Sequence, residues 1–195
     1  MRIILASRND GKLRELQAML ADLPVTLESQ AEHNVPSAEE TGATFIENAI
    51  IKARAVASAT GVAALADDSG LVVPALNGAP GIYSARYAGT HGDDAANNAK
   101  LVSDLQGIDD RRAYFYCAMA LLQFAQDPTP IVVTAAWHGE IVDNAAGENG
   151  FGYDPHFFLA DHGKTSAQLA AAEKNQISHR GQATAALIRQ LAALV

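Results

Sequence analysis

The sequence of 195 residues is poor in cysteine, in basic residues and in long apolar runs. Its one cysteine, Cys117, excludes an intramolecular disulfide and any zinc site built from several cysteines. Such sparse cysteine fits a reducing compartment, so we expect a cytoplasmic location. The apolar run at residues 3–6 is too short for the core of a signal peptide or for a membrane span. We therefore expect no membrane partner.

The shortage of positive charge limits the class of partner. Fourteen Lys and Arg residues stand against 22 Asp and Glu residues, which gives a net charge of −8. A protein that coats polymeric nucleic acid needs a surplus of Lys and Arg, so we expect no such partner. A small phosphorylated ligand needs only a few local cations, and a divalent metal can offset the acidic groups of the protein.

The hydrophobic pattern predicts an α/β fold in one domain over residues 1–195. Hydrophobic residues make up 49% of the chain, which can fill a core, and there is no repeat or linker-like stretch. The predicted helices cover residues 12–20, 44–60, 93–105 and 178–194. The predicted strands cover residues 3–6, 25–29, 62–66, 71–73, 114–124 and 130–137. Helices and strands alternate first and a β-rich part follows, which indicates a long mixed central sheet, flanked by helices, with a cleft beside it.

Two adjacent acids, Asp67 and Asp68, are the most informative pair in the chain. They follow an apolar run and precede Ser69 and Gly70, so we expect them where a strand ends. Neighbouring side chains of an extended segment point to opposite faces, which predicts different roles for the two acids. Carboxylates held in this way suit a divalent cation or the activation of water. The alternative is a turn that ends the strand, with Gly70 at a positive φ.

The turn between the first strand and the first helix is the second chemical signal. Free backbone N–H groups and the helix dipole attract an anion there, Gly11 permits close approach and Lys12 adds a charge. The turn is not a Walker A loop, because Ala6 and Leu13 stand where that motif has glycine and Ser/Thr. The alternative is an ordinary turn in which Asn9 or Asp10 caps the helix.

Other polar residues are expected near these two features. Asn48 and Lys52 share a helix face, and Lys52 could reach Asp68. The aromatic loop at residues 150–155 can stack a planar ring. His179 and Arg180 follow the capping Ser178 at a helix N-terminus, where a cation opposes the dipole, which favours a role in ligand binding over one in helix stability.

Taken together, these motifs resemble the inosine/xanthosine triphosphate pyrophosphatases. The resemblance covers nearly the whole chain and rests on motifs in the same order: S-R-N-x-G-K at 7–12, E-x-G at 40–42, E-N-A at 47–49, A-D-D-S-G at 66–70, G-A-P-G-I-Y-S-A-R-Y at 78–87, G-F-G-Y-D-P at 150–155, E-K-N at 173–175 and S-H-R at 178–180. It implies a two-lobed α/β fold around a substrate cleft, a homodimer, and Mg²⁺-dependent hydrolysis of ITP, dITP or XTP to the monophosphate and pyrophosphate.

The resemblance also implies a role for each matching residue. Asp68 is the expected proton acceptor, and Asp68 and Glu40 are the expected metal ligands. The expected phosphate loop consists of Ser7, Arg8, Asn9, Asp10, Gly11 and Lys12, with Ser69 as a further substrate contact. The expected base and ribose pocket consists of Phe151, Gly152, Tyr153, Asp154, Lys174, His179 and Arg180.

Three other interpretations of the sequence compete with this one. A kinase or GTPase is disfavoured, because the chain has neither a Walker A Ser/Thr nor a G-x-G-x-x-G loop. A non-catalytic purine nucleotide sensor would use the same phosphate loop and base pocket without turnover, and Asp68 is the feature that speaks against it. A purely structural interpretation makes the acids turn residues only.

Overall fold

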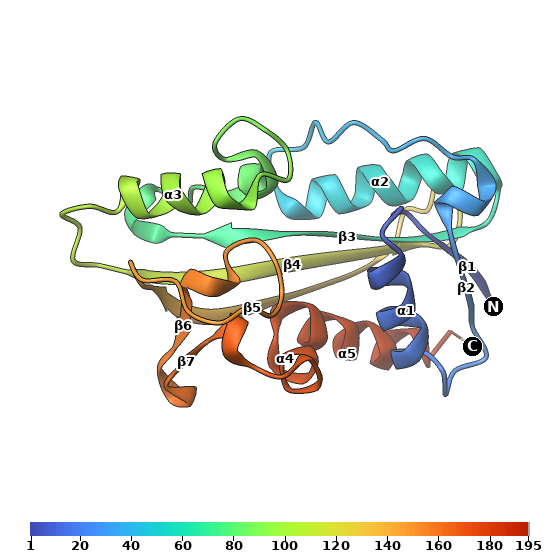
Figure 1. The fold of residues 1–195 in the computed structure, drawn as a ribbon. Coiled ribbons are helices and arrows are strands. Elements are labelled where there is room, and N and C mark those ends of the chain that lie inside the picture. Colours follow the sequence, from blue (N-terminus) through green and yellow to red (C-terminus); the bar gives the residue numbers. More distant parts are fainter. Residues whose placement is uncertain (195) are drawn as a thin grey trace. The chain divides into compact units, whose positions relative to one another are not determined.

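The computed structural model describes residues 1–194 and has a mixed, seven-stranded sheet (Figure 1). The sheet order is β2-β1-β3-β4-β5-β6-β7. β1 pairs in parallel with β2 and β3, whereas β6 pairs in antiparallel with β5 and β7. The strands are β1 (Arg2–Leu5), β2 (Thr26–Ser29), β3 (Ala63–Val72), β4 (Arg112–Leu122), β5 (Ile131–Ile141), β6 (Phe157–Leu159) and β7 (Lys164–Thr165). The predicted α/β fold with a long mixed sheet is confirmed.

Five α-helices lie in the described part of the chain: α1 (Asp10–Met19), α2 (Phe45–Thr60), α3 (Asp94–Asp104), α4 (Ala171–Ile177) and α5 (His179–Leu191). All but α4 were predicted within a few residues. Ser178 caps α5 as expected, because its hydroxyl accepts from the Gly181 N–H at 3.2 Å. Within residues 1–194, every helix is too short or too polar to cross a bilayer.

The chain divides into two compact units, each built from separate segments. The first unit contains residues 1–68, 117–134 and 183–195, and the second contains residues 69–116 and 135–182. In the first unit, α2 covers one face of β1 and β3, and α1 covers the other (Figure 1). The predicted single domain and the predicted substrate cleft stay predictions.

Helix α2 packs on the sheet through small side chains. Ala49, Ala53, Val56 and Ala57 are buried, whereas the larger Ile50 is only partly buried. Short side chains let a helix approach a sheet closely. Asn48 is also buried on this face of the helix. The buried face of α2 therefore carries a polar group as well as an apolar stripe.

Strand β3 differs from the prediction at its most informative point. We expected a strand that ends at Ala66 and a second segment at residues 71–73, but β3 runs without a break over Ala63–Val72. β1 pairs with it only as far as Leu65, while the eleven-residue β4 lies on its other side. Asp67 and Asp68 consequently lie inside a strand, and both the strand-end and the turn interpretation were wrong.

Aromatic rings form the core of the second unit. Phe157 is fully buried, with its ring centroid 4.6 Å from that of Phe115 and 5.3 Å from that of Trp137. Gly139 of β5 leaves room for this ring, because a Cβ at that position would lie 2.7 Å from the Phe157 Cζ and 2.6 Å from the Phe158 carbonyl oxygen. A side chain at residue 139 would therefore overpack this part of the core.

We expect Gly139→Ala to lower the free energy of unfolding by about 1–3 kcal/mol, because the added methyl group overpacks the core against a backbone oxygen and a buried ring. Urea titration measures the change. The matched control is Glu140→Ala at the next, exposed position of β5, where the change should stay within about 0.5 kcal/mol. Equal stability of Gly139→Ala and the wild-type protein would show that the ring can move aside.

Candidate active site

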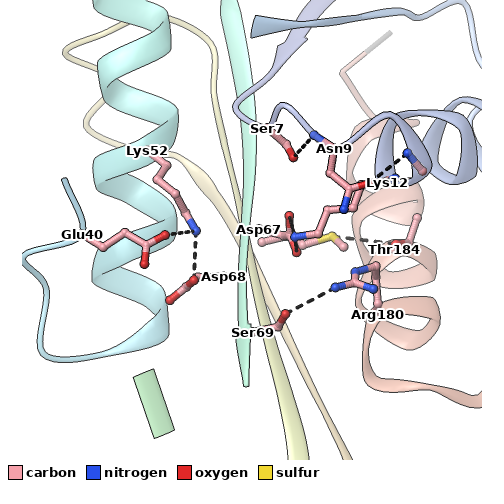
Figure 2. A network of polar contacts seen from close by, with 12 residues as sticks. Ser7, Asn9, Lys12, Glu40, Lys52, Asp67, Asp68, Ser69, Arg180 and Thr184 are labelled. Atoms are coloured by element: carbon pink, nitrogen blue, oxygen red, sulfur yellow. Dashed lines mark hydrogen bonds and ion pairs between the residues drawn. The ribbon is translucent and has the colours of Figure 1, made fainter. Parts of the chain in front are cut away.

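Asp67 and Asp68 each meet a lysine, and the two lysines come from different helices of the first unit. Lys12 of α1 donates to both carboxylate oxygens of Asp67, at 2.9 and 2.8 Å. Lys52 of α2 donates to Oδ1 of Asp68 at 2.9 Å. Because α1 and α2 cover opposite faces of the sheet, the two acids point to opposite faces, as predicted (Figure 2).

Asp68 lies in a network of four side chains. Lys52 Nζ also donates to Oε1 of Glu40 at 2.8 Å, so one ammonium group joins two carboxylates (Figure 2). Asn48, one helical turn before Lys52, donates its amide to Oδ2 of Asp68 at 3.3 Å. The structure therefore brings Asp68 and Glu40, the two predicted metal ligands, to the same ammonium group.

Burial and charge act on this network in opposite directions. Burial is the largest influence on Asp68 and, with the nearby charge of Glu40, raises the pKa of the carboxyl above its ordinary value, although Lys52 and Asn48 oppose the change. Burial by itself would lower the pKa of Lys52, but the surrounding carboxylates outweigh it and raise that pKa. The result is a lysine that keeps its charge and a carboxylate that is more basic than a free aspartate.

Asn48 is fixed by the segment before α2. Its Oδ1 accepts from the Gly42 N–H at 2.8 Å, and a Cβ at residue 42 would lie 2.7 Å from that same oxygen. Glycine is required there because the backbone must approach the amide closely. Gly42 and Asn48 thus orient the amide that contacts Asp68, while Glu47 serves the helix end and accepts from the Ala43 N–H at 2.8 Å.

Several donors of the predicted phosphate loop make hydrogen bonds within the loop itself. Asn9 caps α1, and its Oδ1 accepts from the Gly11 and Lys12 N–H groups at 2.9 and 3.1 Å. Ser7 Oγ accepts from the Asn9 N–H at 3.1 Å. Asn9 therefore caps α1, as the alternative interpretation expected, and the phosphate-binding role of the loop stays a prediction.

The side chain of Arg8 is not part of these hydrogen bonds within the loop. The guanidinium of Arg8 donates to the carbonyl oxygen of the buried Val35 at 3.1 Å, which ties the loop to the segment that follows β2. The side chain of Asp10 lies outside the part of the chain that the structure describes. Arg8 therefore has a structural contact that its sequence position did not suggest.

In the second unit, Asp154 organises the predicted base pocket. Its buried carboxylate pairs with Lys174, accepts from the Phe151 N–H at 2.8 Å and accepts from the Ser166 hydroxyl at 2.7 Å. Gly150, at φ +80°, lies directly against this ion pair, and a Cβ there would overlap the carboxylate. Asp154 thus holds the loop, whereas the side chain of Phe151 remains 65% exposed.

Two cations lie near the exposed Phe151 ring. Lys174 Nζ is 5.4 Å and Arg180 Cζ is 5.9 Å from the ring centroid, within the range of cation–π attraction. Arg180 also donates to the Ser69 hydroxyl at 3.4 Å (Figure 2). The structure therefore groups Phe151, Lys174, Arg180 and Ser69, as the sequence motifs suggested.

His179 and Tyr153 are both buried, with exposures of 8% and 4%. The His179 ring stacks on Phe115 with the centroids 4.9 Å apart and the planes 11° from parallel. The Tyr153 hydroxyl donates to the Ser84 carbonyl oxygen at 2.8 Å, and burial, together with the charges of Tyr87 and Asp94, raises its pKa so that it stays protonated. Both residues connect the pocket to the core.

A backbone contact sets the position of Arg180. A Cβ at Gly181 would overlap the carbonyl oxygen of Asn175, so the first turn of α5 lies directly against the end of α4. Only glycine permits this approach. Sequence analysis missed Gly181 and also Ser166, and no local motif could have identified Ser166, since its partner Asp154 lies twelve residues earlier.

Known proteins resemble this chain along almost its entire length. A family model described as the Ham1 family matches residues 3–190. The dITP/XTP pyrophosphatase of Chromobacterium violaceum is 54% identical over 193 residues, which cover 99% of this chain and 98% of that protein. The dITP/XTP pyrophosphatase of Bordetella pertussis is 55% identical over 195 residues, with coverages of 98% and 92%.

Solved structures agree with this assignment. A HAM1 protein from Coxiella burnetii superimposes with a TM-score of 0.96 at 49% identity and covers 99% of both chains. The Ham1 protein of Staphylococcus aureus gives a TM-score of 0.92 at 43% identity and covers both chains completely. The family resemblance inferred from the motifs is confirmed, and the chain belongs to the Ham1 family.

Proposed function

We propose that this protein is a Mg²⁺-dependent nucleoside triphosphate pyrophosphatase that hydrolyses ITP, dITP and XTP to the monophosphate and pyrophosphate. The observation that carries the proposal is the setting of Asp68, a partly buried carboxylate with a raised pKa that Lys52 and Asn48 hold in place. The names of the related dITP/XTP pyrophosphatases support the same substrates. This activity removes nonstandard purines from the nucleotide pool.

In this mechanism a water molecule attacks the α-phosphorus in line with the departing pyrophosphate. Asp68 accepts the proton of that water, and the raised pKa of its carboxyl makes the carboxylate a better base. Lys52 and Asn48 keep the carboxylate in a fixed orientation, which lowers the entropic cost of reaching the transition state. A non-catalytic sensor has no use for such a carboxylate.

The residues present fit a magnesium ion. The described residues contain no cluster of three or more His, Cys, Asp or Glu that could hold a metal. Mg²⁺, however, commonly takes one or two carboxylates and completes its shell with water and substrate phosphates. Asp68 and Glu40 would hold it, because their oxygens already converge on one cation, the Lys52 ammonium. When bound, the ion would neutralise charge on the phosphate oxygens.

The loop of residues 7–12 would bind the triphosphate, with Lys12 as its charge. In this structure the Gly11 and Lys12 N–H groups donate to Asn9, and the Lys12 ammonium group donates to Asp67. Phosphate binding therefore requires these hydrogen bonds to break. A phosphate oxygen accepts the same hydrogen bonds from the Gly11 and Lys12 N–H groups, and its charge makes them stronger than the bonds to the neutral Asn9 amide oxygen.

The base and ribose would lie against the group in the second unit. Phe151 offers an exposed ring for stacking, and Lys174 and Arg180 provide donors beside it. The buried His179 would be a further contact of the base. Hypoxanthine and xanthine present an acceptor at O6 and a donor at N1, and adenine reverses both. Donors at this point therefore favour a 6-oxo purine. Ser69 would contact the substrate next to Asp68.

We further propose a cytoplasmic homodimer that acts on free nucleotides, with neither polymeric nucleic acid nor a membrane as a partner. The net charge of −8 supports the choice of a small substrate over polymeric nucleic acid.

Asp68→Asn should reduce kcat by roughly 10²-fold or more, because the amide cannot accept the proton of water. Steady-state kinetics with ITP and Mg²⁺ measures the loss. The matched control is Asp67→Asn, the same change on the opposite face of β3. We expect a smaller loss there, seen mainly in KM, because Asp67 orients Lys12. Near-wild-type turnover of Asp68→Asn would remove Asp68 from the role of base.

Attack at the α-phosphorus should release pyrophosphate, whereas a GTPase-like attack at the γ-phosphorus releases orthophosphate and a diphosphate. We expect a colorimetric orthophosphate assay to remain negative until inorganic pyrophosphatase is added. The nucleotide product, identified by ion-exchange chromatography, should be IMP. Direct release of orthophosphate together with IDP would rule out the proposed bond cleavage.

Arg180→Ala should lower kcat/KM for ITP more than for ATP, because it removes a contact to the base. We expect the same direction for His179→Ala and Lys174→Ala, although the latter also removes the ion-pair partner of the buried Asp154. Lys12→Ala is the contrasting variant and should weaken all triphosphates about equally. An equal loss toward ITP and ATP in Arg180→Ala would assign Arg180 to the triphosphate instead.

A further inference from the structure

Helix α3 holds the loop that carries Phe151 at a single glycine. Oδ2 of Asp94 accepts from the Gly152 N–H at 2.6 Å, and the Asn98 amide donates to the Gly152 carbonyl oxygen at 2.8 Å. Asp94 and Asn98 are four residues apart and therefore lie on one face of the helix. Both backbone groups of Gly152 are thus bound from the same helix, and all of these residues belong to the second unit.

The Asn98 side chain is costly for the helix itself. Its amide donates both to Gly152 and, at 2.8 Å, to the carbonyl oxygen of Asp94, whereas its own Oδ1 is buried without a hydrogen-bond partner among the described residues. A buried acceptor without a donor is unfavourable, and asparagine is a weak helix former. Helix stability therefore does not explain Asn98, but the contact with the loop does.

Two further hydrogen bonds hold the residues next to Gly152. The Tyr153 hydroxyl binds Ser84, and the Asp154 carboxylate binds the Phe151 N–H. Together with the contact to α3, these bonds hold the backbone on both sides of Phe151. The ring itself remains exposed beside Lys174 and Arg180, so the fixed backbone presents an aromatic surface to solvent.

We propose that Asp94 and Asn98 are positioning residues for base recognition, which set the Phe151 ring for stacking on the purine by holding Gly152. The inference rests on the proposed function, because it takes the base to bind at Phe151. A ring that is held in advance loses less conformational freedom when the base stacks on it, so the benefit appears in substrate binding rather than in the chemical step.

The decisive variant is Asn98→Asp, which keeps the size of the side chain and places a carboxylate against two carbonyl oxygens. We expect KM for ITP to rise roughly five- to tenfold with kcat within about twofold of wild type. Inhibition by tripolyphosphate, which has no base, should be unchanged. Hydrogen exchange of a peptide that covers residues 150–154 should become several-fold faster, because Gly152 loses one of its two bonds to α3.

Asp94→Ala removes only the more exposed bond and should show the same pattern at about two- to threefold in KM. Asp93→Ala is the control: Asp93 caps α3 through the Ala96 N–H and, among the described residues, makes no hydrogen bond to Gly152. It should alter neither KM nor the exchange of residues 150–154. If it matched Asn98→Asp, the effect would belong to the helix and the inference would be wrong.

The remaining outcomes separate this inference from the proposed function. Wild-type protein that releases no pyrophosphate from ITP would overturn the proposed function and the inference with it. Active wild-type protein with an unchanged KM in both Asn98→Asp and Asp94→Ala would overturn the inference alone. An increase in the inhibition constant of tripolyphosphate equal to the increase in KM would also overturn it, since the base would then not be the group affected.

Discussion

Two neighbouring carboxylates within one continuous strand are the constraint on which the first unit depends. Because side chains alternate along β3, Asp67 and Asp68 point to opposite faces, and each needs a cation from a different helix. Lys12 of α1 and Lys52 of α2 supply these charges. Removing one partner of a buried ion pair typically costs about 3–5 kcal/mol, so the sequences of both helices are tied to that of the strand.

The second unit contains a loop without regular secondary structure, residues 150–153, which side-chain contacts must hold in place. The buried carboxylate of Asp154 replaces the missing backbone ladder by binding an amide, a hydroxyl and an ammonium group. Gly150 supplies the left-handed backbone and the free space that the ion pair needs. Stacking of His179 on Phe115 extends this order into the aromatic core. The exposed Phe151 ring is therefore attached to a well-packed loop.

Much of the fold could be predicted because local patterns determine it. The helical period of the apolar residues predicts α2, and the β-branched and aromatic runs predict β4 and β5. β3 was misjudged because Asp, Ser and Gly at residues 67–70 have low strand propensity, and tertiary partners override that preference. The short strands β6 and β7 were not predicted, because segments of three and two residues are too short to show an alternation of apolar and polar side chains.

The sequence by itself determined the chemistry that is available: adjacent acids, a lysine within reach of one of them, a loop at a helix start and an aromatic loop that can stack a ring. Motif order was enough to identify the family, because several rare motifs coincided along the chain. Only the tertiary structure decided the pairing of each acid with its own lysine, the role of Asp154 as the centre of a loop and the contact of α3 with Gly152. These depend on residues 12 to 58 positions apart, and no local rule relates such distant side chains until packing brings them within hydrogen-bond distance.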